Sequence, residues 1–265
     1  ATSKLVKAWE SKNAKNAAKA GGISLMALSL AACGGSSTTT TTSTDTTTDT
    51  TTTVTAVASN FTTGIDALAG TAAADTFTGD AATISGADSV SGGDGSDTLK
   101  VYGVNVAGLP TISGIESLEV HNVEPGDLNI ATGVLAGITS ATLDGFTASG
   151  ETVTVKSGDL VTLSDVTGGG DVNIAAAATV TEATISVVSS GASGANVDLD
   201  VNGAGITTLN IDVSGATASF IDVSELAAVT TVDIDASTAV TIAEIENAKT
   251  IDASGSTAGV TFSLI

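Results

Sequence analysis

Short stretches in which apolar and polar residues alternate recur through the second half of the chain. Each stretch places Val, Ile or Leu at every second position, with Thr, Ser, Asp or Asn between them. Alternation with a period of two predicts β-strands that bury one face and expose the other. Segments containing Gly, Ser, Asp or Asn follow most of these stretches, and such segments favour turns.

The predicted strands form two interleaved ladders from residue 112 to residue 265. The central residues of the first are Leu118, Leu143, Leu163, Ile185, Leu209, Val232 and Ile251. Those of the second are Ile130, Val153, Ile174, Leu199, Ile221, Ile242 and Phe262. Both ladders advance by about 22 residues a step, a period typical of solenoids. We therefore predict an all-β fold, a parallel β-helix (β-solenoid) of about seven coils, right-handed like most parallel crossovers.

An antiparallel β-sandwich is the alternative, because its strands recur at similar intervals. Two features favour the solenoid. The segments ITTLNIDVSG at 206–215 and VTTVDIDAST at 229–238 nearly coincide, as stacked coils would. Aromatic residues make up only 3% of the chain, whereas a sandwich core usually contains large side chains. In the predicted coils the apolar residues point inward, and acids such as Asp198, Asp200 and Asp212 point to solvent.

The first 54 residues have a different character. Residues 1–33 contain five of the eight lysines, an apolar run at 23–32 and the single cysteine, Cys33. This layout predicts an export signal, and the Leu-Ala-Ala-Cys sequence ending at Cys33 resembles the lipobox of bacterial lipoproteins, in which the cysteine is acylated. The alternative is a short N-terminal anchoring helix that keeps Cys33 as a free thiol. Residues 34–54 are mostly Ser and Thr and predict a disordered linker.

Glycine and aspartate gather in residues 55–111, the predicted start of a β-roll. Gly92–Lys100 reads GGDGSDTLK and fits the nonapeptide G-G-x-G-x-D-x-U-x at every fixed position. Partial copies occupy Gly70–Thr78 and Thr83–Ser91. The glycines permit a tight turn, and aspartate and carbonyl oxygens suit Ca²⁺. A turn that binds no ion is the alternative. The candidate calcium-site residues are Asp75, Asp88, Gly93, Asp94, Gly95 and Asp97.

On these motifs, residues 65–265 resemble the RTX-type calcium-binding surface-layer and related surface proteins that Gram-negative bacteria export by type I secretion. The resemblance rests on SGGDGSDTLKV at 91–101, SGIESLEVHN at 113–122 and the later ITTLNIDVSG-type strands. It implies a β-solenoid that is ordered by Ca²⁺ and assembles into a lattice or filament. The chain departs from the pattern in having few intact nonapeptides and no extended acidic block near residue 265, which puts the type I route in doubt.

Charge and side-chain chemistry narrow the function further. The chain has 29 acidic residues, eight Lys and no Arg, for a net charge of −21. Such a chain repels nucleic acids and attracts divalent cations. The single histidine, His121, is predicted to lie on the surface, and no nucleophile motif surrounds it. Sugar-cleaving β-helix enzymes usually need Arg or Lys and aromatic faces beside their acids, whereas this sequence has no Arg, one Trp, one Tyr and five Phe. We therefore predict neither an enzyme nor a small-molecule substrate.

The sequence thus predicts a secreted or surface-anchored structural protein that forms a homo-oligomer or polymer on the bacterial outer surface. The segment GVTFSLI at 259–265 is apolar and strand-like and carries no polar cap. Exposed strand edges tend to pair with another chain, so we expect this end to stack on a second subunit. The alternative is an adhesin or binding module, anchored in the outer membrane as a lipoprotein through Cys33.

Overall fold

The computed structural model describes residues 54–265 except 225, 227, 246–247 and 265. The signal-like segment with Cys33, its predicted helix and residues 34–53 of the predicted linker lie outside the described residues. Within the described part, two 3-10 turns, η1 (Val106–Gly108) and η2 (Gly133–Leu135), are the only helical segments. No helix found there is long and apolar enough to cross a membrane.

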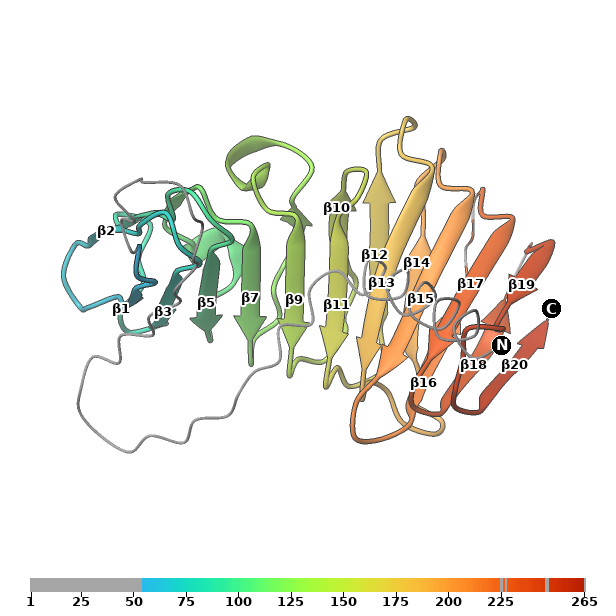
Figure 1. Ribbon diagram of the computed structural model, residues 1–265. Helices are drawn as coiled ribbons and strands as arrows, with labels where there is room; N and C mark the ends of the chain where they lie inside the picture. Colours follow the sequence, from blue (N-terminus) through green and yellow to red (C-terminus); the bar gives the residue numbers. More distant parts are fainter. Residues whose placement is uncertain (1–53, 225, 227, 246–247, 265) are drawn as a thin grey trace, which may run out of the picture. The chain divides into compact units, whose positions relative to one another are not determined.

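The described chain folds as a parallel β-solenoid of about 9 turns with ~22 residues per coil, which confirms the predicted fold class. Figure 1 shows the strands stacked side by side along one axis, in the order of the sequence. Every named strand pair is parallel, so the β-sandwich alternative is wrong. The coil number exceeds the predicted seven because the glycine-rich segment before residue 112 winds into the same stack.

Three sheets make up the walls of the solenoid. The long sheet contains β1 (Ala58–Asn60), β3 (Thr76–Asp80), β5 (Thr98–Tyr102), β7 (Ser117–His121), β9 (Ser140–Asp144), β11 (Leu160–Ser164), β13 (Glu182–Val188), β15 (Thr208–Ser214), β17 (Thr231–Ala236) and β19 (Thr250–Asp252). The N-terminal sheet contains β2 (Ala67–Ala69), β4 (Ser89–Ser91) and β6 (Thr111–Ser113). The C-terminal sheet contains β8 (Leu128–Asn129), β10 (Glu151–Val155), β12 (Asp171–Ala176), β14 (Val197–Val201), β16 (Ser219–Val223), β18 (Val240–Ile245) and β20 (Val260–Leu264).

The long sheet continues through the whole described chain, whereas its companion changes between β6 and β8. The predicted segments 55–111 and 112–265 therefore share one sheet and differ in the other. Coils before the change have short second strands and glycine-rich turns. Coils after it have longer second strands, such as β10 and β12, which pair over five residues.

Alternating burial along the strands shows how the sequence pattern fills the interior. In β7, Leu118 is 0% and Val120 1% exposed, while the residues on either side of each are partly exposed. The same inward column continues with Leu143, Leu163 and Val187 in the following coils. Burial of these side chains is the main favourable contribution to folding, at about 25 cal/mol per Å² of apolar surface. Branched and small side chains suit this narrow interior because each coil contributes only a thin layer.

The predicted ladders assign strands to the right sheets but miss part of the register. Leu118 lies opposite Ala141 rather than Leu143, and Leu163 lies opposite Val187 rather than Ile185. In the second ladder Val153 lies opposite Leu128, two residues before the predicted Ile130. A slip of two residues leaves each side chain on the same face, so the apolar pattern cannot detect it. The lengths of the connecting turns set the register instead.

Carboxylates gather on the C-terminal sheet, where β14 and β16 pair through Asp198 and Asp222. Ser224 Oγ donates to Asp198 Oδ1 at 3.0 Å and to Asp200 Oδ1 at 3.1 Å. Asp200 was predicted to face solvent, but it is only 6% exposed. Asp222 Oδ1 is buried and has no hydrogen-bond partner among the described residues. Burial, together with the charges of Asp198 and Glu244, raises the pKa of Asp222 to about 6.

Because Asp222 lies partly buried beside other carboxylates, we predict that the solenoid is more stable at mildly acidic pH than at neutral pH. A folded-state pKa above the usual value for Asp222 means that its favourable contribution is present below about pH 4 and is lost as the pH rises through about 6. Urea unfolding should therefore give a larger free energy of unfolding at pH 5.0 than at pH 7.5, by on the order of 1 kcal/mol after solvent screening.

The substitution Asp222→Asn removes the charge and should raise stability at pH 7.5 while flattening the dependence between pH 5.0 and 7.5. Glu124→Gln, at an exposed position between β7 and β8, serves as the matched control and should leave the slope unchanged. An Asp222→Asn protein with the same pH slope as the parent would show that Asp222 does not titrate in this range.

Candidate calcium site

Two glycine-rich turns lead from the N-terminal sheet into the long sheet and lie one above the other. Gly70–Asp75 precedes β3, and Gly92–Asp97 precedes β5. Their last residues are linked across the coils, because the Asp75 N–H donates to Asp97 Oδ1 at 2.7 Å. The Asp97 N–H in turn donates to Glu116 Oε2 at 2.9 Å. Carboxylates thus continue the interstrand hydrogen bonding at this corner of the solenoid.

The first turn uses both oxygens of its aspartate within the protein. Asp75 Oδ1 accepts the backbone N–H of Val57, and Oδ2 accepts the backbone N–H of Thr71. The Thr71 hydroxyl adds a contact of 3.1 Å to Oδ2. Asp75 is 1% exposed, so its carboxylate acts as a buried acceptor that closes the turn. This arrangement explains why a partial nonapeptide can keep the aspartate as a structural residue.

The second turn, which has the complete nonapeptide, leaves one oxygen of its aspartate unused. Gly93 and Gly95 have φ angles of 106° and 126°, in the region that favours glycine. A Cβ at Gly93 would lie 2.1 Å from the Thr71 carbonyl oxygen, so no other residue fits there. In this conformation Asp97 Oδ2 has no hydrogen-bond partner in the described chain, although Asp97 is 0% exposed.

The electrostatic surroundings of Asp97 disfavour its negative charge, in keeping with the unpaired Oδ2. Burial raises the pKa of Asp97 above its usual range, and the charges of Asp75 and Glu116 add to the rise, against the hydrogen bond from the Asp75 N–H. Buried polar atoms are almost always paired, and an orphan oxygen in a native protein points to an ion, a water molecule or a proton. A divalent cation would remove both the repulsion and the unpaired acceptor.

A backbone oxygen approaches the unpaired carboxylate oxygen. A Cβ built on Gly92 would lie 2.3 Å from Asp97 Oδ2 and 1.8 Å from the carbonyl oxygen of Gly114. Both oxygens therefore lie close to the Cα of Gly92, where any side chain would clash with them. The Gly92 carbonyl oxygen and Asp75 Oδ2 lie in the same way around Gly70. Carboxylate and carbonyl oxygens are the ligands that Ca²⁺ uses in proteins. The residues fit a calcium ion held by Asp97 and carbonyl groups of the stacked turns, where it would supply positive charge.

The six predicted site residues do not form one cluster. Asp97, Gly93 and Gly95 share one turn, and Asp75 lies in the turn one coil earlier. Asp94, at the tip of the second turn, is exposed. Among the residues that the structure describes, no group of three or more His, Cys, Asp or Glu side chains could hold a metal ion. The ligand roles of Asp75 and Asp94 therefore remain predictions.

Asp88 lies on the other side of the solenoid, between β3 and β4. Its Oδ1 accepts the Asp66 N–H at 2.9 Å, and its Oδ2 accepts the Ser85 N–H at 2.6 Å. These two backbone hydrogen bonds lower the pKa of Asp88. Pro110 occupies the equivalent position one coil later, where it ends this column of carboxylates. Asp88 thus has the same turn-closing contacts as Asp75, and its predicted calcium role remains a prediction.

Sequence reasoning missed Gly114 and Glu116, which complete the stack after Asp97. The available signal was the constant spacing of Gly70, Gly92 and Gly114 in the sequence, which places glycine at the same corner of three coils. Glu116 was missed because the nonapeptide pattern has no fixed acid at that point. Its longer side chain still reaches the Asp97 N–H, as an aspartate does elsewhere in the column.

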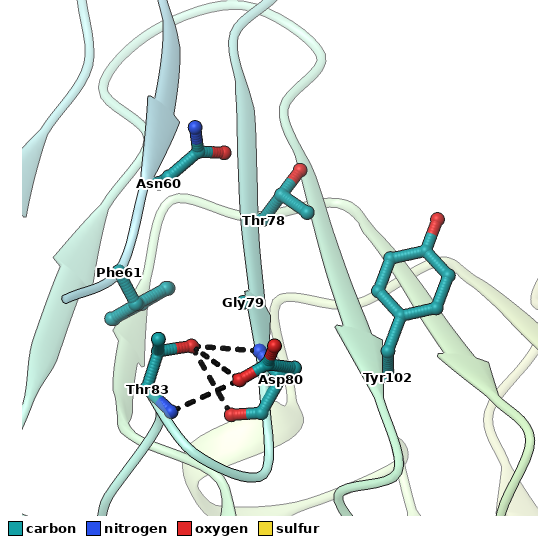
Figure 2. A pocket seen from close by; sticks show the side chains of 7 residues that line it. All are labelled: Asn60, Phe61, Thr78, Gly79, Asp80, Thr83 and Tyr102. Atoms are coloured by element: carbon teal, nitrogen blue, oxygen red, sulfur yellow. Dashed lines mark hydrogen bonds between the residues drawn. The ribbon is translucent and has the colours of Figure 1, made fainter. Parts of the chain in front are cut away.

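A shallow depression of about 240 Å³ lies on the outer face of the long sheet, near β1, β3 and β5 (Figure 2). Its lining consists of Asn60, Phe61, Thr78, Gly79, Asp80, Thr83 and Tyr102. His121, predicted to be a surface residue, is only partly exposed and lies beside this depression, stacked on Tyr102. Its Nδ1 is 2.8 Å from Asp144 Oδ2 and its Nε2 is 3.2 Å from Glu119 Oε2.

Comparisons of the chain with protein-family models, with curated proteins and with solved structures found no match. The interpretation of the site therefore depends on its own geometry.

Exchanging single aspartates distinguishes the calcium interpretation from a purely structural turn. In Asp97→Asn, the amide oxygen can still accept the Asp75 N–H, and its NH₂ group replaces the unpaired oxygen beside the Gly114 carbonyl. We expect stability without Ca²⁺ to be retained or increased, and the gain in melting temperature on adding Ca²⁺ to be lost. Differential scanning calorimetry with EDTA and with excess CaCl₂ measures both effects.

Asp75→Asn is the matched control, because both oxygens of Asp75 accept backbone N–H groups. In Asp75→Asn, the side-chain NH₂ group would face one of these N–H groups, which then has no acceptor. The free energy of unfolding should fall by about 1–3 kcal/mol with or without Ca²⁺. If Asp97→Asn melts like the parent in both solutions, or if the parent gains nothing from Ca²⁺, the calcium interpretation fails.

Proposed function

We propose that this chain is a structural protein of the bacterial cell surface, that its solenoids stack end to end, and that Ca²⁺ stabilises its glycine-rich coils. The supporting observation is the last described coil, where the apolar column of the C-terminal sheet continues without cover. Phe262 in β20 lies opposite Ile242. Ile242 is 0% exposed, whereas Phe262 is 41% exposed. One further coil on this side would bury Phe262 as the other members of its column are buried.

The first described coil offers edges of the same kind at the other end of the stack. In the described residues, β1 pairs only with β3, β2 pairs only with β4, and Ile65 is 81% exposed. Strand edges with free N–H and C=O groups are templates for pairing with another chain. Because all strands run parallel, a second copy joined head to tail would continue both sheets in the same direction. Such a contact does not close on itself and generates a filament.

The strongly acidic charge supports the dependence on a divalent cation. A net charge of −21 keeps separate copies apart through mutual repulsion, and cations between them would reduce it. The complete nonapeptide at Gly92–Lys100, with its unpaired Asp97 oxygen, offers an internal position for one such ion. The resemblance to exported RTX-type surface proteins is consistent with both parts of the proposal and with an extracellular location.

Assembly can be tested by negative-stain electron microscopy and sedimentation velocity on the full chain, in CaCl₂ and then in EDTA. We expect elongated particles several solenoids long in CaCl₂, and shorter species after chelation. Phe262→Asp places a charge on the proposed contact and should shift the population to monomers. Val134→Asp is the matched control, because Val134 is 76% exposed but lies at η2, away from both ends.

A chain that stays monomeric in both solutions would contradict the assembly proposal and favour the tethered adhesin instead. Particles of Phe262→Asp as long as those of the parent would show that the described C-terminal coil is not the contact.

A further inference from the structure

The ring of Tyr102 is held in one orientation on the outer face of the long sheet. It stacks on His121 with ring centroids 4.6 Å apart and an angle of 15° between the planes. His121 is itself fixed by Asp144 and Glu119. Strand pairing places His121 on one side of Tyr102 and Asp80 on the other. Tyr102 is 39% exposed, so the ring face that does not meet His121 is available beside Asp80.

Asp80, an exposed residue, lies in the lining of the depression shown in Figure 2, with Tyr102 on one side and Phe61 with Thr83 on the other. Its Oδ1 accepts N–H groups from Ala82 at 2.9 Å and Thr83 at 3.1 Å, and the Thr83 hydroxyl at 3.0 Å. These hydrogen bonds lower the pKa of Asp80, and the bond from the Ala82 N–H has the largest effect. The Asp80 carboxylate is therefore ionised at neutral pH. Its Oδ2 takes no part in these hydrogen bonds.

The cationic residue next to this depression is already neutralised. Lys100 lies opposite Thr78, but its Nζ is bonded to Glu119 Oε2 at 2.8 Å. The exposed aromatic face and the carboxylate therefore lie in a region of net negative charge. An aromatic face attracts cations through the negative potential over its ring, and a carboxylate strengthens this attraction. A strongly hydrated metal ion gains little from an aromatic wall, whereas an organic ammonium group can contact both.

We propose that the depression between Tyr102 and Asp80 binds an organic ammonium group, either a quaternary ammonium of a small molecule or the side chain of a lysine. Phe61 and Thr83 form the opposite wall, and Thr78 and Asn60 offer polar atoms at the rim. The site is distinct from the candidate calcium site, because its lining comes from β1, β3, β5 and the turn after β3 rather than from the Asp97 turn. It does not rest on the proposed assembly, because its aromatic wall, Tyr102, lies on β5, the third strand from the described end of the long sheet.

The single tyrosine of the chain makes the test direct, because tyrosine ring signals in an NMR spectrum come from Tyr102 alone. The full chain with ¹³C-labelled tyrosine is titrated at constant ionic strength with choline, with Nα-acetyl-lysine amide and with 3,3-dimethylbutan-1-ol. The alcohol is the uncharged isostere of choline. We expect saturable ring shifts with an ammonium probe, at affinities on the order of millimolar, and a several-fold weaker response to the alcohol.

Asp80→Asn retains the oxygen that accepts the Ala82 and Thr83 N–H groups, so it removes the charge and keeps the turn. It should weaken ammonium binding several-fold, whereas Asp233→Asn on β17 should not change it. A response to choline identifies small quaternary ammonium ligands, and a response to the lysine derivative alone identifies a lysine side chain. No shift with either probe, an equal response to the alcohol, or unchanged binding in Asp80→Asn would overturn the proposal.

Discussion

Parallel backbone hydrogen bonds between successive coils set the constraint on which this structure depends. Each residue must adopt a backbone conformation that allows hydrogen bonds to the equivalent residue one coil away. This constraint is hardest to satisfy in the turns between two sheets, at the corners of the coil. After β6 the corner before the long sheet is bridged by backbone groups, as when the Thr207 N–H meets the Thr181 carbonyl oxygen at 2.9 Å. In the glycine-rich coils, carboxylates such as Asp97 make this link instead. Carboxylates stacked at the corners of successive coils accumulate negative charge. Linking the coils in this way therefore requires positive charge or protons that offset it.

The sequence pattern was sufficient to predict the architecture but not its details. Period-two alternation and a repeat of about 22 residues identified the strands and their parallel stacking, because these features follow directly from burial on one face. The register of Leu118 against Ala141 was not predictable, since a slip of two residues preserves the apolar face. The burial of Asp200 was likewise missed, because alternation assigns it to the outer face and does not show how much of that face is covered.

The candidate site was predicted in part for similar reasons. The nonapeptide pattern located Asp97 and the glycines around it, since a turn with positive φ angles needs glycine at fixed places. It could not distinguish Asp97 from Asp75, because both occupy the same motif position. The difference arises from the residue after the first glycine, where the Thr71 N–H closes onto Asp75 and Gly93 makes no such bond to Asp97. That distinction depends on the positive φ angle at Gly93, a conformation that glycine permits and that Thr71 does not adopt.

Together these features support the proposal that cations order this acidic solenoid and that copies of it stack end to end. Its central claim is that the unpaired oxygen of Asp97 marks an ion site. The most direct measurement is a crystal structure grown with Ca²⁺, with anomalous scattering used to identify the ion. The account predicts a calcium ion that contacts Asp97 Oδ2 and carbonyl oxygens of the stacked turns. A turn without a metal ion, with Asp97 protonated or bonded to water alone, would contradict it.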